Sequence, residues 1–550
     1  MASDSTPTFF ERYGRWLAWA ILTLALGFFI WQVYTRYVPT YYGLADEHGY
    51  LTTAKRLALH GELAQHQSDP YAFIGETMMQ SPADPSVYYL RQPLGYPLIT
   101  AAAYYLGGAE GPFAVNPLLG LALIFGIYRV GCGLGSQVGG AVAGAVMAAS
   151  TLVLYYTIEP LSHILDMTLA VWCITAALAW RKDHKWWQAA LCGLLVGAAV
   201  LTRYVSVLLL LPLFVILLEK FKTIPRRIML GHITIAGGMM FIAIIPLLMY
   251  QHAAYGSIFR TGYSAGDNAT SFSLAWFLAH APAMSAILAM PEFGISAMLL
   301  AALAGIVVFF RKKNWFVPTM LLAWALPPLI VYTAYYGMST KNMLLYARFA
   351  LPSFVPLVLL GAVWPISVVR QKTLAYGSVI AAAIATVALN TFLNPKMDKQ
   401  FVDTQNYHLY TYAAELILHQ NVPSGSVVIG DNYTHYFADY TGDYVVYDPS
   451  MFKGEKLEQR LADLTQKPHE FDPARTRQLQ ELLGNRTDAQ RFAILREQLE
   501  KYAASGKPIY LLTTDINASY WQQMLALPMK SIAQNEIALH LFEIDARAAH

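Results

Sequence analysis

The sequence predicts a polytopic α-helical membrane protein with about eleven transmembrane helices and a C-terminal soluble α/β domain. Of the 550 residues, 56% are hydrophobic and 13% are charged, and this charged fraction is roughly half that of an ordinary soluble domain. Apolar stretches recur along the chain as far as residue 392, and those of about 20 residues are long enough to cross a bilayer. From about Asn394 the chain becomes richer in charge and in turn residues, which indicates a soluble domain at its end.

The apolar segments are spaced as in a multi-pass protein. The start of the chain has Arg12 and Arg15 before the first segment and no small-residue cleavage signature, which is typical of an uncleaved signal anchor. A shorter apolar run, 93–108, opens with Gln-Pro-Leu-Gly-Tyr-Pro, so we expect an interfacial or re-entrant helix there. The eleven predicted spans lie near 15–36, 113–131, 137–157, 162–180, 186–202, 204–219, 229–250, 291–310, 315–335, 348–368 and 373–392.

The distribution of positive charge predicts the orientation of these spans. With a cytoplasmic N-terminus, every basic cluster falls on the cytoplasmic side, as the positive-inside rule requires. Counting 93–108 as a full crossing would break this agreement, because Arg181 and Lys182 would move outside. The tail from 394 is therefore expected on the periplasmic or extracellular side. The cytoplasmic turns hold Arg129; Arg181, Lys182 and Lys185; Lys220, Lys222, Arg226 and Arg227; Arg311, Lys312 and Lys313; and Arg370 and Lys372.

Three regions follow from these patterns: a transmembrane domain over 1–393, a first outer loop with interfacial helices over 37–112 inside it, and an α/β domain over 394–550. In the last region, short apolar runs at 427–430, 444–447, 509–512 and 539–542 predict strands. The segments 410–419 and 475–502 predict helices, the second with a solvated face. The stretch 65–86 shows no pattern that predicts a structure.

Several function classes are excluded by composition and motifs. The net charge of +3 is too small to indicate nucleic-acid binding. The three cysteines, Cys132, Cys173 and Cys192, lie in or beside apolar segments without metal-ligand spacing, so no disulfide framework is predicted. The sequence contains no P-loop, zinc motif, nucleophile elbow or dinucleotide fingerprint. Energy from a cytosolic nucleotide is therefore not expected.

An acidic pair, Asp46 and Glu47, follows the first span and precedes a partly amphipathic run that starts at Tyr50. Ionisable groups at a membrane exit are costly and are functional candidates by default. A carboxylate in apolar surroundings can be tuned to accept a proton from a hydroxyl or an amine. We therefore predict that Asp46 is a general base. The alternative is a solvated loop carboxylate that caps the following helix.

Three arginines stand at outer ends of apolar segments: Arg91, Arg203 and Arg348. A guanidinium at the membrane interface can hold a lipid phosphate with two parallel hydrogen bonds. The alternative is an arginine that extends to the lipid headgroups from a helix end. Three such residues on the face opposite the basic clusters indicate an anionic membrane substrate.

Other candidates lie near the same face. Asp166 interrupts an otherwise apolar helix, where a carboxylate is expensive unless it is paired or faces water, so we predict a role at the site. Glu159 has a helix cap as its alternative role, and His163 has a structural hydrogen bond. The segment 255–263, which ends at Tyr263, fits either a substrate-covering loop with glycine hinges or a plain turn.

Taken in order, these residues resemble those of the GT-C glycosyltransferases. The acidic pair follows the first span, Arg91 precedes Pro-x-Gly-Tyr-Pro, and Asp166 opens a later outer span. Leu-Thr-Arg at 201–203 follows a glycine-rich span, and Tyr-Ala-Arg-Phe at 346–349 precedes Pro352 and Pro356. The resemblance covers most of the chain and is greatest to the branch of protein O-mannosyltransferases and the aminoarabinose transferase of lipid A.

The resemblance implies an inverting transferase of the GT-C type in a bacterial inner membrane. It would use a polyprenyl-phosphate sugar on the non-cytoplasmic face, and a lipid, a polysaccharide or a protein would accept the sugar. Asp46 would be the catalytic base, with Glu47 and Asp166 as supporting carboxylates. Arg91, Arg203 and Arg348 would hold the donor phosphate. No cofactor, metal or nucleic acid is expected. Possible substrate contacts are His48, Tyr50, Glu159, His163, Tyr263 and Tyr346.

The sequence also departs from the pattern. Gln92 follows Arg91, and the oligosaccharyltransferase signature Trp-Trp-Asp-Tyr-Gly is missing, since Trp186 and Trp187 continue as Gln188. This disfavours the metal-dependent branch that transfers whole glycans. One alternative is a transporter or flippase that uses the arginines for phosphate and Asp46 for proton coupling, although paired halves with broken helices are not evident. Another is a scaffold that acts through the tail.

Overall fold

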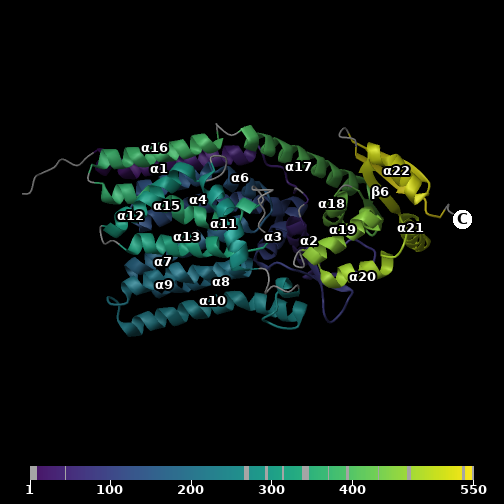
Figure 1. Cartoon of the computed structure of the whole chain (residues 1–550), viewed down its shortest axis with the longest axis horizontal. Coiled ribbons are helices and arrows are strands. Elements are labelled where there is room, and N and C mark those ends of the chain that lie inside the picture. The colour runs from purple at the N-terminus through teal and green to yellow at the C-terminus, as the bar shows by residue number, and fades with distance from the viewer. Residues whose placement is uncertain are drawn as a thin grey trace, which may run out of the picture.

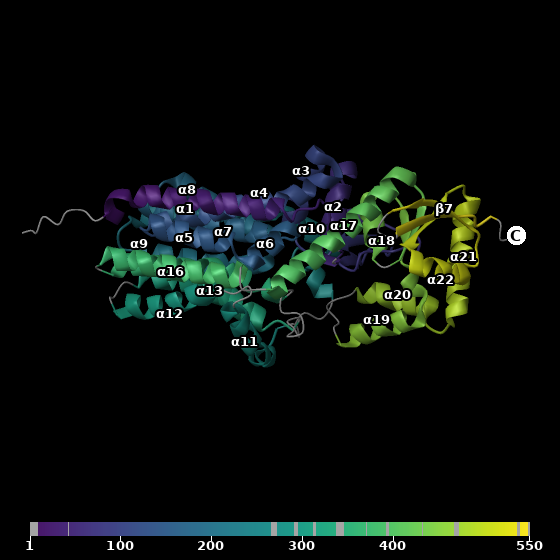
Figure 2. The ribbon, with the colours of Figure 1, turned by 90° about the horizontal axis from the view of Figure 1, so that it is seen from above.

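A computed structural model gives the arrangement of the chain. A bundle of long helices occupies one end of an elongated molecule, and a part that contains a β-sheet occupies the other (Figure 1). Figure 2 shows the same division in a view turned by 90°. The structure describes residues 9–41, 43, 45–265, 272–290, 295–311, 315–336, 346–369, 371–391, 395–431, 433–466, 472–535 and 539–547.

The bundle makes the chain a multi-pass membrane protein. Within the described residues, six helical stretches are long and apolar enough to cross a membrane, or seven if the pair α5 and α6, bent by 61°, is one span. The bundle helices are α1 (Phe9–Tyr34), α4 (Val115–Gly133), α5 (Gln137–Ala148), α6 (Thr151–Ile158), α7 (His163–Asp183), α8 (Trp186–Thr202), α9 (Leu210–Lys220), α10 (Arg226–Tyr255), α11 (Leu274–Ala289), α12 (Ser296–Arg311), α13 (Phe316–Thr333), α15 (Leu351–Val368) and α16 (Lys372–Thr391).

Helices coincide with all eleven predicted segments, but not all are full spans. Those at 186–202 and 296–311 are shorter than 18 residues, and the segment from 204 begins as a 3-10 helix, η2 (Tyr204–Leu209). The bend between α5 and α6 has a local cause: the side chain of Ser150 accepts a hydrogen bond from the amide of Val153 and starts a new helix. Because several of these helices are too short to count as spans, eleven crossings stays a prediction from the sequence.

The spans differ in how much protein surrounds them. In an 18-residue stretch of α7, 78% of the residues are buried, against 11% in α10. Since α10 is apolar on all sides, its exposed faces suit lipid, whereas α7 lies inside the bundle. The N-terminal end of α7 carries His163 and Asp166, and both side chains are buried.

The first outer loop has more structure than its sequence predicted. After α1 come α2 (Ala45–His60) and three short strands, β1 (Ala64–His66), β2 (Met78–Gln80) and β3 (Val87–Leu90), which form an antiparallel sheet of order β1-β3-β2. The stretch 65–86 therefore supplies part of a sheet that ends next to Arg91. The run predicted as an interfacial helix forms α3 (Gly95–Gly107), which packs against α2 and joins α4 through η1 (Gly108–Ala114).

The C-terminal part contains a five-stranded sheet of order β5-β4-β6-β8-β7. Strand β4 pairs in parallel with β5 and β6, whereas β8 is antiparallel to β6 and β7. All four residues of β4 are buried, as expected of a parallel strand covered on both faces. The elements are α17 (Pro395–Asn421), β4 (Val427–Gly430), α18 (Thr434–Thr441), β5 (Val445–Tyr447), η5 (Pro449–Phe452), α19 (Gly454–Gln466), α20 (Pro473–Leu483), α21 (Asp488–Ala504), β6 (Ile509–Thr514), α22 (Asp515–Leu525), β7 (Met529–Gln534) and β8 (Leu539–Ile544).

The four predicted strands are confirmed, and two other expectations change. The helix predicted over 475–502 is wrong as a single helix: it is α20 and α21, separated where Thr487 caps the second helix through the amide of Gln490. The sequence missed β7, whose six residues are all half-buried or exposed and therefore give no apolar alternation. The helix predicted at 410–419 is the end of the longer α17. The predicted domain boundary at 393/394 lies outside the described residues.

The two ends of the molecule share a hydrophobic core. Tyr41, Leu51 and Phe73 of the first outer loop pack in one buried cluster with Phe437 and Tyr440 of the C-terminal part. The ring of Tyr41 lies edge-on to Phe437, with centroids 5.0 Å apart. The C-terminal part is therefore fixed to the first outer loop, which carries the acidic pair.

Candidate active site

Asp46 lies in the first turn of α2, where a helix favours negative charge. Gln92 Nε2 donates a hydrogen bond of 2.7 Å to Asp46 Oδ1. Arg348 Nη1 lies 3.2 Å from Asp46 Oδ2. The Asp46 side chain retains 29% of its exposure, against 15% for Arg348. Asp46 is thus an oriented carboxylate with one open side.

Arg203 directly follows α8 and extends into a polar group formed at the ends of α7, α8 and α13. Its guanidinium donates to the hydroxyl of Tyr332 over 2.8 Å and to Ser162 Oγ over 3.2 Å. Its Nη1 also lies 3.1 Å from Nε2 of His163. The hydroxyls of Tyr50 and Ser162 are 3.2 Å apart, so a residue of α2 contacts the Arg203 group.

Asp46 and Arg203 therefore border the same region. Asp46 and Tyr50 are four residues apart in α2 and share one face of that helix. Through Asp46 this face contacts Arg348, and through Tyr50 it contacts Ser162, which also binds Arg203. The predicted base thus lies along one face of α2 together with Arg203 and Arg348, two of the predicted phosphate-binding arginines.

Arg91 follows β3, and two close approaches position it. A side chain at Gly95 would place its Cβ 2.3 Å from Thr202 Oγ1, so the start of α3 touches the end of α8 beside Arg203. At Gly262 a Cβ would lie 2.4 Å from the Cα of Arg91. The segment before Tyr263 therefore rests directly on Arg91, and the charge of Asp46 acts on the Arg91 guanidinium.

Each of the three arginines lies over an aromatic ring. The guanidinium carbon is 5.4 Å from the ring centroid of Tyr263 for Arg91, 5.7 Å from Tyr332 for Arg203 and 5.2 Å from Phe349 for Arg348. A ring face stabilises a cation without using its N–H donors. These ring contacts add to the hydrogen bonds that Arg203 donates to Tyr332 and that Arg348 donates to Asp46. Tyr346 packs near Phe349, with ring centroids 6.2 Å apart.

The supporting carboxylates occupy different places. Asp166 is buried and accepts a short hydrogen bond from Ser206 Oγ, and the charge of Arg203 acts on it. Glu47 and Glu159 are completely buried, and Glu159 Oε1 lies 3.2 Å from His408 Nε2 of α17. Burial lowers the pKa of His408 to about 4, against the opposing charge of Glu47. Both glutamates therefore neighbour His408 of α17 in the C-terminal part.

His48 departs from its predicted substrate contact. It is completely buried, its Nε2 lies 2.9 Å from Asp439 Oδ2, and the rings of Phe73 and Tyr436 enclose it. Two residues along a helix turn by about 200°, so His48 points away from the face that carries Asp46. Proximity in sequence to Asp46 was misleading here.

The sequence missed four polar residues of the site: Gln92, Ser162, Ser206 and Tyr332. Gln92 was noted only as a departure from a family pattern, yet it binds the predicted base. The other three lie in or beside apolar segments, where a single hydroxyl leaves no periodic signal. Among the described residues, no group of three or more histidine, cysteine or acidic side chains could hold a metal ion.

The comparisons with known proteins bear on the fold. Residues 91–250 match the family model of dolichyl-phosphate-mannose-protein mannosyltransferases. The structure of ArnT from Cupriavidus metallidurans bound to undecaprenyl phosphate aligns with a TM-score of 0.57 at 12% identity, over 95% of this chain and 97% of that one. The chain has the fold of the GT-C glycosyltransferases. The GT-C resemblance drawn from the sequence is thus confirmed.

Two more GT-C structures align over nearly the whole chain. AglB from Archaeoglobus fulgidus, in complex with an inhibitory peptide and a dolichol-phosphate, has a TM-score of 0.50 at 11% identity, over 98% of this chain and 75% of that one. The arabinofuranosyltransferase AftD from Mycobacteria has a TM-score of 0.51 at 16% identity, over 98% of this chain and 42% of that one. None of these three proteins is described as a transporter. No curated protein matches the chain in sequence.

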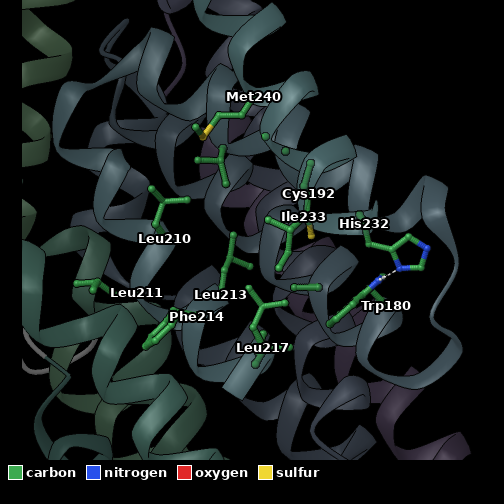
Figure 3. Close-up of a pocket in the computed structure, with 17 residues that line it drawn as sticks. Trp180, Cys192, Leu210, Leu211, Leu213, Phe214, Leu217, His232, Ile233 and Met240 are labelled. Atoms are coloured by element: carbon green, nitrogen blue, oxygen red, sulfur yellow. Dashed lines mark hydrogen bonds between the residues drawn. The ribbon is translucent and has the colours of Figure 1, made fainter. Parts of the chain in front are cut away.

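A large apolar cavity lies in the GT-C bundle beneath Arg203. It measures about 470 Å³ and is lined by residues of α7, α8, α9 and α10, among them Trp180, Cys192, Leu213 and Met240 (Figure 3). Its notable polar contact is the hydrogen bond of 3.0 Å from Trp180 Nε1 to His232 Nδ1. With so little polar lining, the cavity suits a hydrocarbon and not a sugar or a phosphate.

Proposed function

We propose that this chain is an inverting glycosyltransferase. It transfers a monosaccharide from a polyprenyl-phosphate donor to a lipid, a polysaccharide or a protein on the non-cytoplasmic face of the membrane. The observation that carries the proposal is the carboxylate of Asp46, which is oriented by Gln92 and open on one side, next to arginines at the outer ends of apolar helices. Support also comes from the undecaprenyl phosphate bound to ArnT and the dolichol-phosphate bound to AglB.

The reaction needs one proton acceptor and one site for the leaving phosphate. The hydroxyl or amine of the acceptor forms a bond to C1 of the sugar while its proton moves to the carboxylate of Asp46. The bond between C1 and the phosphate oxygen breaks, and the electron pair leaves with the polyprenyl phosphate. Arg91 and Arg203 stabilise the negative charge that develops on this phosphate. Attack opposite the leaving group inverts the anomeric centre.

The ion pair between Arg348 and Asp46 suggests how the donor prepares the base. A phosphate accepts paired hydrogen bonds from a guanidinium, so an arriving donor competes with Asp46 for Arg348. Once Arg348 turns to the phosphate, Oδ2 of Asp46 loses its ion-pair partner and can accept a hydrogen bond from the acceptor. Donor binding therefore precedes proton transfer, and an acceptor that arrives alone is not deprotonated.

The apolar cavity can take part of the polyprenyl chain. Val196 lines it and lies seven residues before Arg203 in the same helical segment, which is about 10 Å along the axis. A phosphate at Arg203 thus places the first isoprene units within reach of the cavity. Its volume of about 470 Å³ lies in the range of ligand cavities, about 300–1,000 Å³.

The central experiment is the isosteric change Asp46→Asn. Transfer from a synthetic polyprenyl-phosphate sugar is followed in detergent, and donor binding is measured separately. Turnover is expected to fall by about 10²–10⁴-fold, the usual contribution of a general base, with unchanged donor affinity. The matched control is Asp84→Asn, an exposed aspartate of the same outer loop, which should keep full turnover. Full turnover by the Asp46→Asn protein would overturn the assignment of the base.

The chain-binding role of the cavity is tested by filling it. Val196→Phe is expected to weaken the use of long-chain donors and to leave donors of two or three isoprene units unaffected. The control is Val146→Phe, since Val146 is equally buried and lines another apolar cavity, of about 430 Å³, between α1, α5 and α16. Equal effects of the two variants, or equal effects on long and short donors, would exclude this role.

A further inference from the structure

Asp439 of α18 binds the helix that carries Asp46. α2 and α18 lie side by side where the bundle meets the C-terminal part (Figures 1 and 2). Besides His48, Asp439 Oδ2 lies 3.6 Å from Arg56 Nη2. Lys55 Nζ donates to the backbone oxygens of Asp439, over 2.7 Å, and of Gly442, over 3.0 Å. The end of α18 thus contacts one imidazole and two cationic side chains of α2.

This contact is buried and strongly electrostatic. The side chain of Asp439 is 9% exposed and that of His48 is fully buried. Burial opposes the ionisation of Asp439, but the hydrogen bond from His48 and the charges of Arg56 and Lys55 outweigh it, so the pKa of this carboxyl lies well below its usual range. Burial also lowers the pKa of Lys55, to about 8. The loss of the Asp439 charge would leave buried cations on α2.

The contact fixes the rotation of α2 about its axis. His48 and Asp46 both lie in the first turn of the helix and face nearly opposite directions. The rings of Phe73 and Tyr436, with centroids 5.4 and 5.1 Å from that of His48, leave the imidazole little room to shift. A rotation of about 15° would move side-chain atoms about 5 Å from the axis by about 1 Å. A misplacement of that size can cost about 10²-fold in rate.

From this geometry we propose that Asp439 is a positioning residue for the reaction: through His48, Lys55 and Arg56 it holds α2 so that Asp46 faces the donor. The inference rests on the proposed role of Asp46 as the base. It gives the C-terminal part a defined task in catalysis, although Asp439 touches no substrate.

The test compares two aspartates of the C-terminal part that are both buried. Asp431 accepts hydrogen bonds from Asn517 and Trp521, each of 2.7 Å, and from Thr513, of 3.1 Å, all inside the C-terminal part. Asp439→Asn should lower kcat by about 10–100-fold with a donor KM within about threefold of the wild type. Asp431→Asn should leave kcat unchanged, even where it lowers thermal stability. Equal losses of kcat in both variants would mean a general effect of instability and overturn the proposal.

Non-additivity supplies a readout that a purely structural role would not change. If Asp439 acts through Asp46, the double variant Asp46→Asn/Asp439→Asn should turn over no more slowly than Asp46→Asn alone, because coupled residues do not add. Multiplied losses would overturn the proposal. If the Asp439→Asn protein does not fold, the variant His48→Ala is used instead. In it Asp439 keeps its contacts with Lys55 and Arg56, but α2 loses the imidazole that is enclosed by Phe73 and Tyr436. An unchanged kcat in His48→Ala would also count against the positioning role.

The two hypotheses fail separately. Full turnover of Asp46→Asn would overturn the proposed function and, with it, this inference. A large loss in Asp46→Asn together with a wild-type kcat in Asp439→Asn would leave the proposed function intact and overturn only the positioning role.

Discussion

Helix α2 carries one aspartate, Asp46, and contacts another, Asp439, and the surroundings of the two carboxylates differ. Asp46, in its first turn, is held by one amide and one guanidinium, and its side chain is 29% exposed. Asp439, on the opposite side, meets a buried imidazole and a largely buried guanidinium and is 9% exposed. A carboxylate that is to receive a proton needs an open side and a replaceable partner. A carboxylate that holds a structure needs neither, and the comparison separates the two roles without reference to any relative.

The largest expected difference between the two groups is in stability. Asp439→Ala should lower the free energy of unfolding by about 3–5 kcal/mol, the usual result of leaving buried charges without a partner. Asp46→Ala should change it by about 1 kcal/mol or less, since its ion pair is partly exposed. Thermal unfolding in detergent measures both. A larger loss for Asp46→Ala would reverse the comparison.

The next effect concerns the orientation of Asp46. Gln92→Ala should reduce turnover by about 10-fold, because a hydrogen bond to a charged acceptor is worth about 1.5–3 kcal/mol and part of it is felt in the transition state. Steady-state kinetics at saturating donor measures this. The control is Gln80→Ala, which removes a glutamine of β2 that donates to the carbonyl of Pro85. Equal rates for wild type and Gln92→Ala would show that Arg348 alone orients the base.

A third carboxylate extends the comparison to pH. Glu415 of α17 accepts a hydrogen bond of 2.9 Å from Thr40 Oγ1, and burial raises its pKa from 4.5 to about 8. Between these values the folded protein binds more protons than the unfolded chain, so this group makes stability fall as pH rises. Glu415→Gln removes that slope. Its midpoint of thermal unfolding should gain a few degrees on the wild type between pH 5 and pH 9; a constant difference would contradict the assignment.

The smallest effect is expected where both partners face solvent. Lys501 and Glu497 form an ion pair of 2.8 Å on α21, and their side chains are 59% and 62% exposed. Such pairs contribute little because water screens them. Lys501→Ala should leave both the unfolding midpoint and turnover unchanged. A clear loss of stability or turnover would mean that the exposure of a carboxylate does not predict how much it contributes.

The sequence indicated the candidate site through charged residues in unusual positions. A charge at the end of an apolar segment is costly and can be recognised from the neighbouring residues alone. Four residues stand out in this way: Asp46, Arg91, Arg203 and Arg348. Gln92 and Tyr332 could not be found in this way, because a neutral polar group at a helix end has many ordinary uses. Residues two apart in a helix face nearly opposite directions, and only the fold shows that His48 faces Asp439, away from the side of α2 that carries Asp46.

The sequence by itself determined which segments of the bundle are helical, where the sheet of the C-terminal part has four of its strands, and which charges stand at the ends of apolar segments. Hydrophobicity and charge are properties of single segments, so they can be read without knowing the neighbours. Only the tertiary structure decided that Gln92 and Arg348 meet on Asp46, that Arg203 reaches Tyr332, and that Asp439 holds the other side of α2. These pairs are far apart in sequence, and packing alone selects them.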